Sequence, residues 1–284
     1  DEAHPAFQGM ELVQKDFTGE GNGDVHGHGT HCAGTVFGRD VDGTRIGVAP
    51  GVKRALIGKV LSSQGGTSLN IFDAITWAVR EGADVVSMSL GIDFPGYQKR
   101  LECQGYKQEV ATSMALEGYR ANLQLFAALA LSVSKMGVFG RSSLLVAAAG
   151  NESGRNETPP YEVAVAPPAV SDGILSVAAL MQHPDGLKAA PFSNTGARVS
   201  APGVGIVSAR AGGGLTIMSG TSMATPHVAG VAALWAHQIV ATRGVGLGSN
   251  RLLTRLLGSA TQQPLAAEID QMDVGEGIVQ APQR

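Results

Sequence analysis

The chain has 284 residues, 44% hydrophobic and 16% charged, and a formal net charge of −3 at pH 7. This composition is typical of a globular protein with a sizeable core and excludes an intrinsically disordered chain. The weak charge gives no reason to expect a nucleic-acid partner, and no stretch approaches the roughly 20 apolar residues that span a bilayer. The two cysteines, Cys32 and Cys103, are too few for a disulfide framework.

Apolar runs and helical periodicities alternate along the chain. Residues 54–61 predict a strand, and residues 71–79 follow with helical spacing before Gly82, a typical C-terminal stop. A second buried strand is predicted over 83–91. The later predicted elements are a long helix over roughly 107–136, strands over 143–151 and 173–180, and a helix over 221–239.

Strands separated by helices, with continuous rather than alternating apolar runs, indicate a parallel sheet covered on both faces. No linker-like stretch divides the chain, so we expect one α/β domain over residues 1–284. The first residues, Asp-Glu-Ala-His-Pro, have neither the charged start nor the apolar run of a signal peptide, and they do not begin with Met. We therefore expect residue 1 to lie within a longer chain.

Three histidines stand close together in the segment DVHGHGTHCAG, residues 24–34. Histidine is the commonest metal ligand and also the commonest general base, so His26, His28 and His31 admit two interpretations. A zinc site would need a further ligand at a recognisable spacing, and this spacing alone is weak evidence for one.

The segment SGTSMATPHVAG, residues 219–230, places a glycine-flanked serine at the start of an apolar helix. At such a position the hydroxyl of Ser222 is exposed, and the unpaired N–H groups of the helix start can stabilise an oxyanion. A lone serine there is more often an unreactive N-cap, so this segment by itself leaves both readings open.

Three segments together resemble the subtilisin-like serine proteases, the subtilase family: HGTHCAG (28–34), AAAGN (147–151) and GTSMATPHVAG (220–230). Their order along the chain also fits that family. Lesser landmarks agree: GVAP (47–50), SMSLG (87–91), FSNTG (192–196), SAPG (200–203) and GEGIVQA (275–281). The resemblance implies a three-layer α/β/α fold with a central, mostly parallel sheet.

Carried over residue by residue, the resemblance makes Ser222 the nucleophile and His28 the general base. Asn151 becomes the side-chain donor of the oxyanion hole, together with the backbone N–H of Ser222. A serine hydroxyl needs an adjacent base, and the tetrahedral intermediate needs donors aimed at its new oxyanion. His31 matches a structural histidine and His26 has no counterpart, so no catalytic metal and no required cofactor are expected.

The resemblance also implies that a peptide substrate adds as an extended strand between two segments of the enzyme. One segment is 89–91, and the other is expected at 65–67, where the match is looser. The pocket for the substrate side chain before the scissile bond should lie between 89–91 and 148–150, with its floor near VAPPAV (165–170), which could equally be a rigid turn. No charge lies in these segments, so a neutral side chain is expected there. The residues expected to bind substrate are Ser89, Leu90, Gly91, Gly65, Gly66, Thr67, Ala148, Ala149, Gly150 and Ala166.

The triad aspartate of the family has no match in the chain. In the order Asp, His, Ser it lies about thirty residues before the histidine, and counting back from His28 leads to a position just before Asp1. We therefore expect this carboxylate on a strand upstream of Asp1. Asp24 is too close to His28 in sequence to replace it and is expected to be a solvated loop residue.

Two further segments depart from the family. Residues 92–141 form an enlarged connection that includes part of the long helix; it could overhang the substrate cleft or be a surface decoration. The segment FGRDVDGTRIGV (37–48) lies where some relatives bind calcium, and Asp40 and Asp42 are suitable oxygen ligands. Two carboxylates beside a glycine are more often an ordinary turn, so a structural calcium ion is left open.

The sequence thus predicts a serine endopeptidase that acts on polypeptides through an acyl-enzyme on Ser222. A pseudoprotease, which keeps the fold as a binding module, and a peptide ligase or macrocyclase, which passes the acyl group to an amine, are the alternatives. The family resemblance further implies a secreted or extracytoplasmic protein with an N-terminal propeptide.

Overall fold

The computed structural model describes residues 1–136, 142–243 and 248–283. Its main sheet has the order β3 (Val85–Met88), β4 (Leu144–Ala148), β5 (Ile174–His183) and β6 (Gly186–Ala189). A further strand, β7 (Val199–Pro202), also pairs with β5. The pairs β3–β4, β4–β5 and β5–β7 are parallel, and only β6 runs antiparallel to its neighbour.

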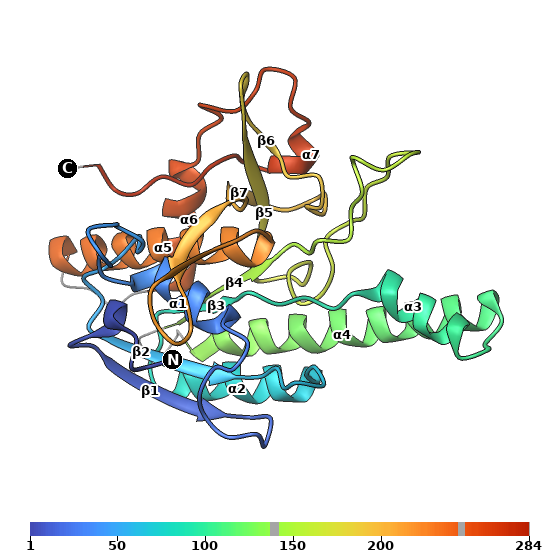
Figure 1. Cartoon of the computed structure of the whole chain (residues 1–284), viewed down its shortest axis with the longest axis horizontal. Coiled ribbons are helices and arrows are strands. Elements are labelled where there is room, and N and C mark those ends of the chain that lie inside the picture. The colour runs from blue at the N-terminus through green and yellow to red at the C-terminus, as the bar shows by residue number, and fades with distance from the viewer. Residues whose placement is uncertain (137–141, 244–247, 284) are drawn as a thin grey trace.

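Helices cover both faces of this sheet, which gives the expected three layers (Figure 1). Leu144 and Val146 of β4 pack against α5 (Thr221–Arg243) and α6 (Ser249–Ser259). Leu145 and Ala147, which alternate with them, pack against the helices α2 (Ser68–Arg80) and α4 (Gln108–Met136). Successive side chains of a strand point to opposite faces, so every residue of β4 is buried and its apolar run is continuous.

A second, two-stranded sheet lies beside the first. Its strands, β1 (Glu11–Asp16) and β2 (Arg54–Lys59), are parallel. They share a separate apolar cluster with the short helix η1 (Pro5–Phe7) and with α1 (His28–Phe37). α2 contacts both β2 and β3 and so joins the two sheets.

The facing edges of the two sheets are open. Among the described residues, β2 pairs only with β1 and β3 pairs only with β4. Leu56 and Ile57 of β2, and Val85 and Val86 of β3, are only half-buried, in contrast to the fully buried β4. Unpaired backbone groups and half-exposed apolar side chains are therefore found where a central strand would lie.

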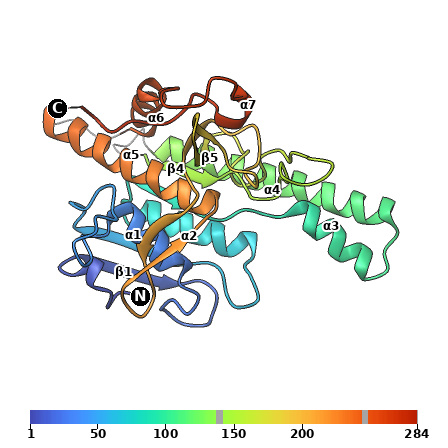
Figure 2. The same ribbon diagram turned by 45° about the horizontal axis from the view of Figure 1, so that its top comes forward.

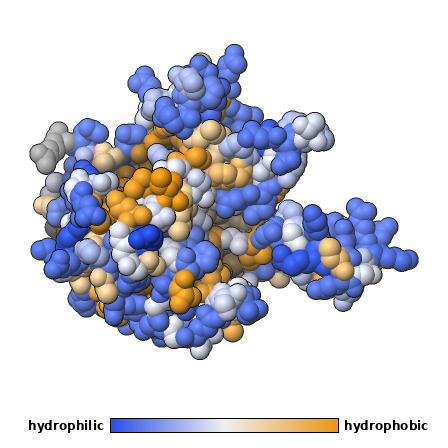
Figure 3. All heavy atoms as spheres, in the orientation of Figure 1, coloured by the Kyte–Doolittle hydropathy of each residue, from blue (hydrophilic) through white to orange (hydrophobic). Residues whose placement is uncertain are grey.

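The connection after β3 forms a helical hairpin. Asp93 caps α3 (Phe94–Cys103) by accepting a hydrogen bond from Gly96 N at 2.7 Å, and Phe94 and Leu101 are buried. α3 and the first half of α4 project from the body of the molecule in both views (Figures 1 and 2). The visible surface of this hairpin is mainly polar, whereas apolar side chains gather on the body (Figure 3).

The remaining elements complete the fold. β8 (Ile206–Ala209) and β9 (Leu215–Met218) form an antiparallel hairpin, and α7 (Gln271–Val274) is a short C-terminal helix. None of the described helices is long and apolar enough to cross a membrane.

Candidate active site

His28 and Ser222 lie at the starts of two helices that pack against each other. His28 is the first residue of α1, and Ser222 is the second residue of α5. Cys32, one turn after His28, lies between them. Its Sγ is 4.0 Å from both Nδ1 and Nε2 of His28, and it donates to the backbone oxygen of Ser222 at 3.4 Å.

The hydroxyl of Ser222 is hydrogen-bonded to the expected substrate strand. Its Oγ donates to the backbone oxygen of Ser89 at 3.3 Å, and Ser89 Oγ donates to the backbone oxygen of Ser222 at 2.7 Å. Within the described residues, no hydrogen bond joins Ser222 Oγ to His28. Such bonds are often long or misaligned before substrate binds, so this geometry is compatible with a serine–histidine pair.

The surroundings of His28 favour its neutral form. Burial lowers the pKa of His28, the nearby His26 lowers it further, and Asp24 opposes the shift. Burial also raises the pKa of the Cys32 thiol to about 11. At neutral pH the site therefore holds an unprotonated imidazole, which can accept a proton, beside an un-ionised thiol.

Asn151 is held by the residue before the serine. Its Oδ1 accepts hydrogen bonds from Thr221 N at 2.8 Å and from Thr221 Oγ1 at 3.0 Å, and Thr221 Oγ1 accepts one from Gly150 N at 3.2 Å. In the part of the chain that the structure describes, Asn151 Nδ2 and Ser222 N have no hydrogen-bond partner. Two donors are thus left for an oxyanion.

Three of the four expected substrate segments lie together. Ala166 N donates to Ala149 O at 3.4 Å, which joins the expected pocket floor to its wall. Ile92 N donates to Pro167 O at 3.2 Å, which joins the segment after Gly91 to the same floor. The alanines of the wall and floor, Ala148, Ala149 and Ala166, are buried.

The fourth expected segment, 65–67, shares no hydrogen bond with these three among the described residues. Gly65 closes a turn with Ser62, and Thr67 caps α2 by accepting a hydrogen bond from Asn70 N at 3.2 Å. No hydrogen bond between described residues links 65–67 to Ser222 or to segment 89–91.

Asp24 lies in a loop as expected, but the expectation that it is solvated is wrong. Asp24 is half-buried and caps α1: its carboxylate accepts hydrogen bonds from the backbone N–H of His26, Gly27 and Thr30 and from the Thr30 hydroxyl. Burial alone would raise its pKa, but the bonds from Thr30 and Gly27 outweigh burial and lower the pKa of Asp24. Asp24 satisfies the N–H of Thr30 in the first turn of α1 and those of His26 and Gly27 just before the helix, which would otherwise be unpaired.

The histidines do not converge on a metal. His31 is fully buried and donates from Nε2 to Ile206 O at 2.9 Å, whereas His26 is exposed. No group of three metal-ligating side chains gathers among the residues described.

The loop considered for calcium forms a tight turn. Asp42, two residues after Asp40, lies in a two-residue hairpin turn with positive φ at Asp42 and Gly43, as in a type I′ turn.

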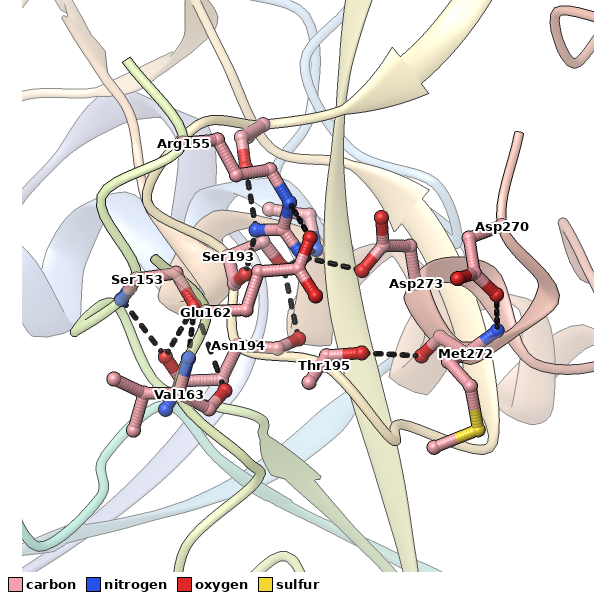
Figure 4. A network of polar contacts seen from close by, with 12 residues as sticks. Ser153, Arg155, Glu162, Val163, Ser193, Asn194, Thr195, Asp270, Met272 and Asp273 are labelled. Carbon is pink, nitrogen blue, oxygen red and sulfur yellow. Dashed lines mark hydrogen bonds and ion pairs between the residues drawn. The ribbon is translucent and has the colours of Figure 1, made fainter. Parts of the chain in front are cut away.

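Sequence reasoning missed a polar network beside this site (Figure 4). It centres on Asn194, which is fully buried, and on Arg155, which pairs with Asp273 of α7. The only sequence signal was the FSNTG segment, which served as a landmark and not as a site.

Comparisons with known proteins agree with this arrangement. A profile of the subtilase family matches residues 8–245. Subtilisin DY of Bacillus licheniformis is 34% identical over 245 residues, which cover 84% of this chain and 72% of that protein. A thermophilic serine proteinase of Bacillus sp. (strain AK1) is also 34% identical, over 84% of this chain and 50% of its own length.

A solved structure supports the same assignment. That of the prenylagaramide maturation protease PagA aligns with a TM-score of 0.67 at 28% identity, over 99% of this chain and 87% of that one. The chain belongs to the subtilase family of serine proteases.

Proposed function

We propose that this chain forms the catalytic domain of an endopeptidase that hydrolyses peptide bonds through an acyl-enzyme on Ser222. The observation that carries the proposal is the convergence of His28, Ser222 and Asn151, with Cys32 packed between the first two and Thr221 holding the third. A serine that only begins a helix does not require the neutral imidazole of His28 beside it. Nor does it require that, among the described residues, Asn151 Nδ2 and its own N–H lack hydrogen-bond partners.

We propose the following roles for these residues. His28 accepts the proton of Ser222 as Oγ attacks the substrate carbonyl, and it then gives that proton to the leaving amine. Asn151 Nδ2 and Ser222 N donate to the oxyanion of the tetrahedral intermediate. Water then attacks the ester, with His28 again as the base, and Ser222 is regenerated.

The substrate is proposed to lie extended along segment 89–91. Its side chain before the scissile bond enters between this segment and Ala148–Gly150, above Ala166. Backbone hydrogen bonds to segment 89–91 would hold the peptide without regard to sequence, as in other strand-addition complexes. Segment 65–67 is proposed as the opposite edge.

The carboxylate that orients His28 is proposed to come from a strand that lies between β2 and β3. The open edges of β2 and β3 and the half-buried Leu56 and Val85 support this proposal. A strand parallel to β3 would have its carboxyl end at the edge of the sheet where Ser89 follows β3. Within the described residues, no carboxylate is hydrogen-bonded to His28.

A narrower substrate class is a second candidate. The solved structures that align over 99% of this chain include those of the prenylagaramide maturation protease PagA and the patellamide maturation protease PatA. A precursor peptide is therefore a candidate substrate.

The α3–α4 hairpin follows directly on segment 89–91, but it projects from the body, which favours a surface element over a lid. By the family argument, we also propose secretion and an N-terminal propeptide.

One experiment separates this proposal from its alternatives. The protein, prepared with the proposed strand, is incubated with a single linear peptide, and the product masses are measured. Hydrolysed fragments support the endopeptidase, a cyclic or amine-linked product supports a ligase, and an intact peptide supports a binding module. Ser222→Ala is the control, and it should leave the peptide intact.

A further inference from the structure

Asn194 is a fully buried polar residue beside the oxyanion loop, residues 149–152, and the proposed mechanism does not use it. It belongs to the FSNTG segment, which connects two strands of the main sheet, β6 and β7. A buried carboxamide is costly unless its hydrogen bonds are made, so its partners show what it holds in place.

The side chain of Asn194 binds the loop at several points. Its Oδ1 accepts hydrogen bonds from Glu152 N at 3.0 Å and Ser153 N at 3.1 Å. Its Nδ2 donates to Glu152 Oε2 at 2.6 Å and to Ala149 O at 3.3 Å. The same Glu152 oxygen accepts a hydrogen bond from Asn151 N at 3.0 Å. Asn194 and the backbone of Asn151 are therefore linked through a single carboxylate oxygen.

The backbone makes the same connection. Asn194 N donates to Gly150 O at 3.1 Å. Gly150 has φ +112°, and a Cβ there would collide with Asn194 Nδ2, so the loop and Asn194 are packed without spare room. Thr221 holds Asn151 from the other side, through the side-chain Oδ1. Asn151 is thus clamped between the helix that carries the serine and Asn194.

Asn194 is itself supported from outside the site. The guanidinium of Arg155 donates to Ser193 O, pairs with Asp273 of α7 and pairs with Glu162 at 3.1 Å (Figure 4). Both Arg155 and Asp273 are mostly buried, so this contact ties the C-terminal segment to the residue next to Asn194.

We propose that Asn194 is a positioning residue of the oxyanion hole, which sets the place of Asn151 through Glu152. The inference rests on the proposed function, because it assigns Asn194 a part in presenting Asn151 Nδ2 to the oxyanion. Asn194 touches neither substrate nor oxyanion.

The main test is the variant Asn194→Asp, which keeps the acceptor for Glu152 N and Ser153 N but places a carboxylate against Glu152. We expect kcat per titrated active site to fall by about 10- to 100-fold, less than the ~10²–10³ lost with an oxyanion donor itself. KM should change by less than about threefold, because the interaction lost is made in the transition state. The control is Asn156→Asp, the same change at an exposed position of the following loop, with kcat within about twofold of wild type.

A double-mutant cycle separates positioning from general stability. The Asn151→Ala variant has no side-chain carboxamide at position 151 for Asn194 to position. In that background Asn194→Asp should therefore change kcat by less than about threefold. Glu152→Gln tests the same link without placing two carboxylates together, in case Asn194→Asp fails to fold. It should lower kcat a few-fold, about 3- to 10-fold, in wild type and not in the Asn151→Ala background.

A readout that does not need activity distinguishes failure of this inference from failure of the proposed function. Amide hydrogen exchange at Asn151 should be faster in Asn194→Asp and in Glu152→Gln than in Asn156→Asp, whether or not the enzyme hydrolyses peptides. An inactive wild type in which both variants speed this exchange would overturn the proposed function alone. Unchanged exchange, or additive losses of kcat in the cycle, would overturn the positioning role of Asn194.

Discussion

The thiol of Cys32 packs against the imidazole of His28, with Sγ 4.0 Å from each ring nitrogen. The same sulfur donates to the backbone oxygen of Ser222 at 3.4 Å. A mercury atom bonded to this sulfur would lie against the imidazole, so we expect it to displace His28.

We therefore expect mercurials to inhibit the enzyme through Cys32. Burial raises the pKa of Cys32 to about 11, so little thiolate is present at pH 8 and inhibition should be slow. Cys103 is exposed and should react first without loss of activity. Mass spectrometry of the modified protein, followed against activity, checks this order. Cys32→Ala should be active and resistant; resistance of Cys103→Ala would show that the assignment is wrong.

Replacing Asn151 with alanine should lower kcat by roughly 10²–10³ with little change in KM, because its hydrogen bond forms mainly in the transition state. Steady-state kinetics on a chromogenic peptide measure this. Thr221→Ser, which keeps the hydroxyl that binds Asn151 Oδ1, is the matched control and should retain most of the activity. An unchanged kcat in Asn151→Ala would remove Asn151 from the mechanism.

The elements that the sequence predicts best are those with one dominant signal. The continuous apolar runs of β4 and β5 and the apolar helix after Ser222 are stabilised by burial within the main core, and local sequence shows this. β1 was missed because its residues are at most half-buried and it needs β2 beside it. α3 was missed although Asp93, followed by Pro95, is a recognisable helix start.

Residues of the candidate site could be proposed from the sequence only where a motif marked them. His28, Asn151 and Ser222 stand in recognisable segments, and the structure places them near one another. Asp24 was misjudged because its partners, the N–H groups of Gly27 and Thr30 at the start of α1, converge on it only once that helix is formed. Asn194 depends on contacts some 40 residues away in sequence, which no local pattern encodes.

For specificity, we expect cleavage after large apolar or aromatic residues and poor cleavage after Lys, Arg, Asp or Glu. The wall and floor, Ala148–Gly150 and Ala166, offer no charge to compensate a desolvated one. Profiling on a peptide library tests this directly. Glu152 follows this wall in sequence, but its carboxylate accepts hydrogen bonds from Asn194 Nδ2 and Asn151 N, and Glu152→Gln is the control variant for its charge. A basic preference would show that other residues build the pocket.

The proposed strand should change both folding and the charge of His28. Burial lowers the pKa of His28 in this chain, so its contribution to stability is present above about pH 6.5 and is lost as pH falls through the lowered pKa. A carboxylate beside the ring favours the protonated form and should raise this pKa. NMR titration of His28, with the strand carrying Asp or Asn at its end, measures the difference.

Residues 1–284 without this strand should be poorly folded and nearly inactive, because β2 and β3 would keep their open edges. Supplying the strand, in cis or as a peptide, should restore folding, and the Asp form should be about 10⁴ more active than the Asn form. Stable folding and full activity of residues 1–284 without the added strand would refute the proposal that such a strand is needed. Some carboxylate already present would then have to orient His28, and Asp24→Ala would be the first variant to make.

The most direct test of the account is covalent labelling with a serine-directed phosphonyl fluoride, read out by peptide mapping of the protein that carries its strand. We predict a single adduct on Ser222, complete loss of hydrolysis at one label per chain, no effect of zinc chelators, and no adduct on Ser222→Ala. His28→Ala should slow labelling, because it removes the base that activates the hydroxyl. Full hydrolytic activity of Ser222→Ala, or inactivation by a label on another residue, would contradict the account.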